Sequence, residues 1–151
     1  MQVGYGTIIR DCKISEGTQI WHHCNLYECK IGKNCRIGSF VEIGKGVSIG
    51  DNCKIQSYAF IPSGVTIGDN VFIGPHVVFT NDKFPRATSE WECSETWVKD
   101  GASIGANSTI LSGIVIGEKA MIGAGSIVTK DVFANHIVYC EAAKERRRTV
   151  H

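Results

Sequence analysis

The chain has 151 residues, of which 43% are hydrophobic and 21% charged, and its formal net charge is +1. This composition fits one globular domain and offers no bulk positive charge for nucleic-acid binding. No stretch approaches the ~20 apolar residues of a membrane helix, and residues 1–6 lack the features of a signal peptide. A cytoplasmic location is therefore expected.

A six-residue repeat begins close to the N-terminus. Large apolar residues recur at Ile8, Ile14, Ile20 and Leu26, and one residue is dropped before the next member, Ile31. Internal repeats of this kind are typical of solenoid folds.

The longest uninterrupted part of the repeat starts at Ile31. Nine consecutive steps of six are large and apolar: Ile31, Ile37, Ile43, Ile49, Ile55, Ile61, Ile67, Ile73 and Phe79. Glycine often follows these anchors, and a small or medium residue stands two before them, as in short strands separated by tight corners. An α-helix is excluded because glycine recurs too often. One strand and one corner per six residues predict three strands per coil of a parallel β-helix.

The repeat stops after Phe79 and is interrupted by residues 80–101. Long inserts in compact domains are usually functional or disordered. This one contains Phe84, Pro85, Trp91 and Trp97, which are uncommon in disordered segments. We therefore predict an ordered external loop that packs on something.

The repeat then resumes and continues nearly to the C-terminus. Its anchors are Ile104, Ile110, Ile116, Ile122 and Val128. All steps together predict a prism of about six coils, roughly 29 Å long at ~4.8 Å per strand. The predicted organisation is an all-β domain, a β-helix over residues 1–140 with its loop at 80–101, followed by a short C-terminal helix or tail over residues 141–151.

Five of the seven cysteines are placed two residues before an anchor. They are Cys12, Cys24, Cys29, Cys35 and Cys53. This position predicts small inward-facing fillers, a role that free cysteine suits. Cys93 and Cys140 fall outside the repeat, and no pair has the spacing of a zinc ribbon.

Two tracts resemble a known family. Residues 101–110 and 116–132 resemble the last coils of hexapeptide-repeat acyltransferases. Residues 77–86, which read Val-Val-Phe-Thr-Asn-Asp-Lys-Phe-Pro-Arg, are similar to the loop of bacterial enzymes that N-acetylate 3-amino groups of nucleotide-linked sugars for surface polysaccharides. The resemblance implies a left-handed β-helix, acetyl-CoA as co-substrate, no required metal, and a homotrimer with its active site between subunits.

Asn81 and His76 are the candidate catalytic residues. Amine acetylation needs an uncharged amine aimed at the thioester and a donor for the oxyanion. The resemblance places Asn81 next to the reacting amino group, although Asn-Asp also starts turns. His76 has an imidazole suited to proton removal, but it follows Gly-Pro at a corner and can equally face solvent or another subunit.

The remaining candidates would hold the two substrates. Asp82 and Arg86 are expected to bind the nucleotide sugar, with a loop-internal ion pair as the alternative. Small corner residues and cations are expected to bind acetyl-CoA, with a solvated basic tail as the alternative for the arginine run. These candidates are Gly105, Ala106, Gly123, Ala124, Lys130 and Arg147.

Three other functions fit the same repeat. An O-acetyltransferase acting on a small hydroxyl would need a strong base, because an alkoxide is harder to form than a free amine. A γ-type carbonic anhydrase would need three zinc-binding histidines, and the five histidines lack that family's spacing. A non-catalytic β-helical scaffold is also compatible with the fold, since fold alone does not establish function.

Overall fold

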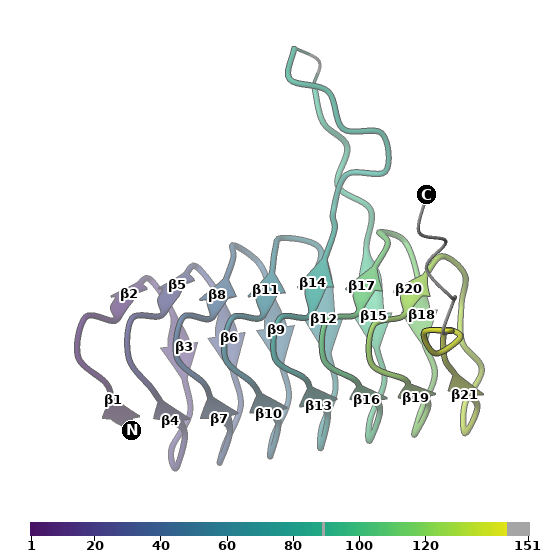
Figure 1. Ribbon diagram of the computed structural model, residues 1–151. Helices are drawn as coiled ribbons and strands as arrows, with labels where there is room; N and C mark the ends of the chain where they lie inside the picture. Colours follow the sequence, from purple (N-terminus) through teal and green to yellow (C-terminus); the bar gives the residue numbers. More distant parts are fainter. Residues whose placement is uncertain (89, 145–151) are drawn as a thin grey trace, which may run out of the picture.

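The computed structural model describes residues 1–88 and 90–144, which form 21 short strands wound into a three-sided prism (Figure 1). The first sheet contains β1 (Gln2–Val3), β4 (Gln19–Ile20), β7 (Arg36–Ile37), β10 (Lys54–Ile55), β13 (Phe72–Ile73), β16 (Ser103–Ile104), β19 (Met121–Ile122) and β21 (Ile137–Val138). The second contains β2 (Ile8–Arg10), β5 (Asn25–Tyr27), β8 (Glu42–Ile43), β11 (Phe60–Ile61), β14 (Val78–Phe79), β17 (Thr109–Ile110) and β20 (Ile127–Val128). The third contains β3 (Lys13–Ile14), β6 (Lys30–Ile31), β9 (Ser48–Ile49), β12 (Val65–Ile67), β15 (Thr96–Val98) and β18 (Val115–Ile116).

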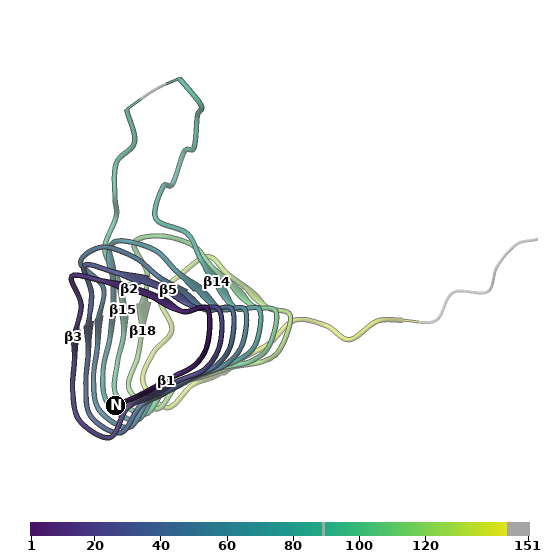
Figure 2. The ribbon, with the colours of Figure 1, turned by 90° about the vertical axis from the view of Figure 1, so that its left-hand side faces the viewer.

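The coil is left-handed. Seen from its N-terminal end, the chain runs counterclockwise through β1, β2 and β3 as it recedes from the viewer (Figure 2). Each strand pairs in parallel with the strand one coil away, as in β4 with β7. The predicted all-β, left-handed β-helix is thus confirmed. We call the turns after the first, second and third sheets the first, second and third corners.

The interior is filled by vertical columns of isoleucine. In the first sheet Ile20, Ile37, Ile55, Ile73 and Ile104 are stacked one coil apart, and each is at most 2% exposed. Burying such a side chain is worth about 1.5–3 kcal/mol, so the repeat itself supplies most of the driving force for folding. Each coil depends on its neighbours to cover this surface.

The number of coils exceeds the prediction of about six. The first sheet alone has eight strands, because β1 precedes the first predicted anchor and β21 follows the last. The first coil also has a different register: Ile9, not Ile8, aligns with Leu26, and Ile8 is 61% exposed. The reason is a second dropped residue, since β2 and β5 both end at shortened corners, where Asp11 and Glu28 have positive φ.

The cysteines lie where the repeat predicts. Cys24, Cys29, Cys35 and Cys53 are buried and Cys12 is half-buried, whereas Cys93 and Cys140 are exposed. The thiols of Cys24, Cys35 and Cys53 donate to backbone carbonyls of adjacent corners. The acceptors are Gly38, Gly50 and Gly68, each at 3.1 Å.

The external loop is shorter than predicted and projects from the second corner, as Figures 1 and 2 show. It occupies residues 80–95, because Thr96 and Val98 already point inward in β15 and leave Trp97 on the outer surface. We call this segment the arm. Phe84 and Trp91 are 74% and 55% exposed, so the arm does not bury these aromatic rings on its own prism.

The predicted C-terminal helix is not present in the part of the tail that the structure describes. Residues 141–144 are irregular, although Lys144 pairs with Glu141 at 2.7 Å, and residues 145–151 lie outside the described chain. The chain leaves the prism after β21, so these residues have no apolar surface to stabilise a short helix. Within the described residues there is no helix with the length and hydropathy needed to span a membrane.

Candidate functional site

The base of the arm and the two corners next to it along the prism axis enclose a cavity of about 340 Å³, which we call the arm-base cavity. β14, β17 and β20 each end at this edge of the prism, and so they deliver residues far apart in sequence to one place. The lining residues are Thr80, Asp82, Lys83, Leu111, Ser112, Gly113, Ile114, Thr129, Lys130 and Asp131.

Two hydroxyl groups lie in the wall of the arm-base cavity. Thr80 Oγ1 accepts a hydrogen bond from Ser112 N at 3.1 Å and donates to Ile110 O at 3.4 Å. The Ser112 hydroxyl is buried and has no hydrogen-bond partner among the described residues. Its oxygen has almost no exposed surface, so this hydroxyl is part of the wall and is not itself open to a ligand.

Charges of both signs line the same cavity. Asp82 Oδ1 accepts from Phe84 N at 2.9 Å, and Asp131 Oδ1 accepts from Val115 N at 2.8 Å. Each carboxylate is therefore held by the backbone. Lys83 and Lys130 take part in none of the ion pairs formed within residues 1–88 and 90–144. The two ammonium groups can therefore receive an anionic ligand.

Asn81 is held at the closed neck of the arm. Its carbonyl oxygen accepts from Ser94 N at 3.2 Å, and the next residue, Asp82, forms an antiparallel bridge with Cys93. A second cavity of about 340 Å³ within the arm is lined by Asp82, Lys83, Phe84, Glu90, Glu92 and Ser94. Asp82 and Lys83 thus border both cavities, with Asn81 adjacent to them.

Arg86, which the sequence interpretation places with Asp82 at the nucleotide sugar, does not share a cavity with Asp82. Its Nη1 donates to Pro85 O at 3.0 Å, and it lines neither arm cavity. The alternative, an ion pair between Asp82 and Arg86, is also not formed between these two described residues. The structure therefore groups Asp82 with Asn81 and leaves Arg86 apart.

His76 lies at the first corner, at the opposite end of β14 from Asn81. The two are five positions apart along the chain, which spans at most roughly 16 Å at 3.3 Å per residue. The imidazole stacks on Tyr58 with centroids 4.7 Å apart, and Phe40 and His23 continue the stack. One chain therefore does not bring His76 and Asn81 to the same reacting group.

The small residues predicted to bind pantetheine are at the first corner of later coils. Gly105 N donates to Ile122 O at 2.8 Å and Gly123 N donates to Val138 O at 2.7 Å, so both amides stabilise the coil. A Cβ on Gly105 would lie 2.5 Å from Ala124 N, which explains why glycine is needed there. Of these four small residues, Ala106 and Ala124 have backbone amides that donate none of the hydrogen bonds between coils within the described residues.

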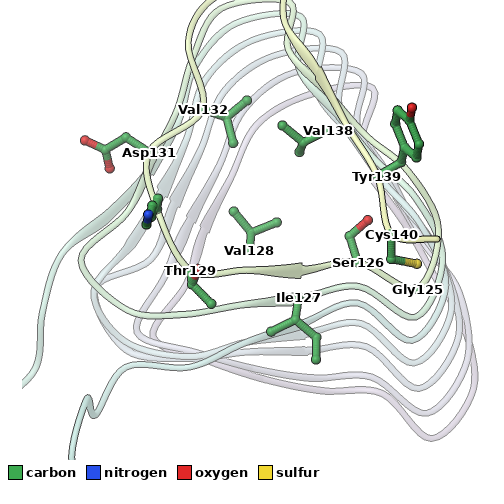
Figure 3. Close-up of a pocket in the computed structure, with 11 residues that line it drawn as sticks. Gly125, Ser126, Ile127, Val128, Thr129, Asp131, Val132, Val138, Tyr139 and Cys140 are labelled. Carbon is green, nitrogen blue, oxygen red and sulfur yellow. The ribbon is translucent and has the colours of Figure 1, made fainter.

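Lys130 borders a further cavity, of about 420 Å³, at the C-terminal end of the prism. Figure 3 shows Ser126, Val128, Val132 and Val138 pointing into the open interior of the last coil. Lys130 therefore stands between this apolar end and the arm-base cavity. Arg147, the other predicted phosphate ligand, lies outside the described residues.

Sequence reasoning missed Lys83, Ser112 and Thr129. Lys83 is part of the loop motif and could have been found there. Ser112 and Thr129 meet the arm only through coil stacking, which no local pattern reveals. No group of three or more His, Cys, Asp or Glu side chains among the described residues is arranged to hold a metal ion.

Comparison with known proteins gives one family match. The model of the bacterial transferase hexapeptide family (six repeats) matches residues 11–45, 46–81 and 95–130, which together exceed half of the chain and leave out most of the arm. No curated protein matches the sequence.

Several solved structures share the fold. A variant of perosamine N-acetyltransferase from Caulobacter crescentus, solved with CoA and GDP-perosamine, has 19% identity and a TM-score of 0.71 over 87% of this chain and 57% of its own. A variant of AntD, an N-acyltransferase from Bacillus cereus solved with dTDP and coenzyme A, has 22% identity and a TM-score of 0.69 over 97% and 84%. WeeI from Acinetobacter baumannii has 24% identity and a TM-score of 0.65 over 78% and 51%. The chain thus spans little more than half of the first and third of these proteins.

Proposed function

The chain belongs to the bacterial transferase hexapeptide family, and from this premise we propose that it is an acetyl-CoA-dependent N-acetyltransferase acting on a nucleotide-linked 3-amino sugar. Family membership agrees with the resemblance seen in the sequence. The substrate assignment draws on the loop of residues 77–86 and on the nucleotides and CoA present in the similar structures. The free cysteines fit a reducing cytoplasm as the site of the reaction.

The observation that carries this proposal is the grouping at the neck of the arm. Asp82, Lys83 and Lys130 line the arm-base cavity, and Asn81 directly precedes Asp82 at the neck of the arm. In the proposed reaction the side-chain oxygen of Asn81 accepts a hydrogen bond from the amine and orients its lone pair towards the thioester. The lysines hold the phosphates of the anionic substrates.

The chemistry needs little from the protein beyond this orientation. The amine nitrogen bonds to the acetyl carbon, the carbon–sulfur bond breaks, and the proton lost by the nitrogen is taken up by the CoA thiolate. Holding two substrates in register supplies a large part of the rate. A protein base is therefore helpful but not required.

A homotrimer with its active sites between subunits is part of the proposal. The arm exposes Phe84 and Trp91, and such exposed aromatic side chains mark contact surfaces. In addition, His76 and Asn81 are at opposite ends of β14, so only a neighbouring subunit can bring a His76 near an Asn81. The arm of one subunit would then cover the first corner of the next.

O-acetylation of a small hydroxyl is the second candidate, and the exposed imidazole of His76 is the observation that favours it. A hydroxyl acceptor needs a base for deprotonation. The first test incubates the protein with acetyl-CoA and a panel of 3-amino nucleotide sugars, with the 3-hydroxyl sugars as matched controls. Thiol release and product mass are measured. Turnover restricted to the hydroxyl sugars would refute the N-acetyl proposal.

Variants then separate the two chemistries. We expect Asn81→Ala to lower kcat for the amino sugar by about 10²-fold, since it removes an orienting hydrogen bond in a preorganised site. His76→Ala should lower it less. Asn25→Ala, on the outer face of β5, is the control for a general effect of losing an amide. If His76→Ala is the more damaging change, the site assignment is wrong.

A further inference from the structure

Cys12 and Cys29 are in contact at the second corner of the first two coils. Their sulfur atoms are 3.4 Å apart, and the thiol of Cys29 donates to Cys12 Sγ. The thiol of Cys12 in turn donates to Arg10 O at 3.2 Å. Each thiol of this pair thus has an acceptor, which is Cys12 Sγ for Cys29 and Arg10 O for Cys12.

The backbone around this pair already has the spacing of a disulfide. The following residues, Lys13 and Lys30, are paired in register in β3 and β6. Parallel neighbours are about 4.8 Å apart, within the roughly 4.4–6.8 Å between Cα atoms that a disulfide spans. The two sulfurs are thus in contact on a backbone whose Cα spacing a disulfide can span.

We propose that Cys12 and Cys29 form a reversible intercoil disulfide when the protein meets hydrogen peroxide. The sulfur of Cys12 attacks the peroxide and becomes a sulfenic acid, with release of one water. The sulfur of Cys29 then attacks the sulfenic sulfur, and a second water leaves as the S–S bond forms. Two thiols are oxidised and one peroxide is reduced to two waters.

The order of these steps follows from accessibility. Cys29 is 2% exposed, whereas Cys12 is only half-buried. Burial, together with the neighbouring Cys12 sulfur, raises the pKa of the Cys29 thiol to about 12, so this thiol is rarely ionised. Cys12 is thus the sensing residue and Cys29 the resolving one.

A second pair provides an internal comparison. Cys35 and Cys53 precede β7 and β10, which are also paired in register, and both are fully buried. Their thiols donate to the carbonyls of Gly50 and Gly68 at 3.1 Å. The neighbouring Cys53 thiol lowers the pKa of the Cys35 thiol to about 7, but both residues are shielded from an oxidant, and we therefore expect them to stay reduced.

The disulfide would tie the terminal coil to the rest of the prism. In a solenoid each coil is stabilised by its contacts with the neighbouring coils. Cross-linking it closes a loop of chain between two adjacent coils. Thermal unfolding should then begin at a higher temperature, by roughly 5 °C for a loop of this size.

The test uses the full chain carrying Cys93→Ser and Cys140→Ser, which removes the two exposed thiols. After stoichiometric peroxide under native conditions we expect the loss of two thiols, a Cys12–Cys29 cross-linked peptide in the mass spectrum, and reversal by dithiothreitol. Cys35→Ser should still form the cross-link. Cys29→Ser should stop at a sulfenic acid on Cys12 that dimedone traps, and Cys12→Ser should lose no thiol.

Two results would overturn the proposal. One is a cross-link that appears only after the protein is unfolded, because the native contact would then be irrelevant. The other is thiol loss in the Cys12→Ser variant equal to that in its parent, because oxidation would then occur elsewhere.

Discussion

The prism of this protein is stabilised by buried side chains, whereas its arm leaves large side chains exposed. In the prism, a side chain such as Ile73 is fully buried and contacts the coils on both sides. In the arm, Phe84 and Trp91 are exposed, and the segment is fixed mainly at its neck by the Asp82–Cys93 bridge and the bond from Ser94 N to Asn81 O. The comparison teaches that the prism is stabilised by stacking along its whole length, whereas the arm is fixed only where it joins the prism. Each can therefore be changed without the other.

Removal of the arm tip should have the largest effect. Replacing residues 84–91 by Gly-Gly keeps Asn81, Asp82 and Lys83 but removes the aromatic surface proposed to contact the next subunit. We expect activity to fall on the order of 10³-fold, because the orientation of the substrates is lost. Circular dichroism and thermal unfolding should change little. Full activity in the shortened protein would contradict the proposed role of the arm in covering the active site of the next subunit, and light scattering reports the oligomeric state.

Ile73→Ala should do the reverse and damage the prism. Truncating a fully buried isoleucine leaves a cavity and costs about 2–5 kcal/mol of unfolding free energy. Denaturant titration measures this loss, and Lys54→Ala, on the outer face of the adjacent β10, is the control with an expected change below about 0.5 kcal/mol. Below the unfolding transition, kcat should stay close to that of the parent. A small stability loss would mean that the columns are less tightly packed than the structure indicates.

Lys130→Gln should give the smallest effect. This residue lines the arm-base cavity but contributes nothing to the isoleucine columns. Loss of one charge-assisted contact to a phosphate should raise KM for acetyl-CoA about tenfold and weaken its dependence on salt. Steady-state kinetics at two ionic strengths measure both quantities. Lys13→Gln, on the outer face of β3, is the matched control, and an equal effect there would show that only long-range charge matters.

The sequence predicts the prism well because its information is periodic and local. Errors arise where that period is ambiguous. Adjacent isoleucines at positions 8 and 9 permit two registers, and the structure uses the second. Val98 is one step of six before Ile104, but the step before it falls on Glu92, so the repeat cannot be followed back through this segment.

The candidate site is only partly predictable, for a physical reason. Asn81 and Asp82 stand in a recognisable motif. Ser112 joins them because β17 is stacked next to β14, a contact between residues some thirty positions apart. Gly105 and Gly123 look like ligand-binding glycines in the sequence, yet the structure shows that coil stacking already requires them.

The ring column at the first corner has a consequence for how the chain finds its fold. Because the interior columns are nearly all isoleucine, a coil that slipped by one hexapeptide would still fill the core. It would not, however, restore the stack of His23, Phe40, Tyr58 and His76, in which every member has a positive φ. These four rings therefore favour the native threading over its slipped copies in the four coils that contribute them.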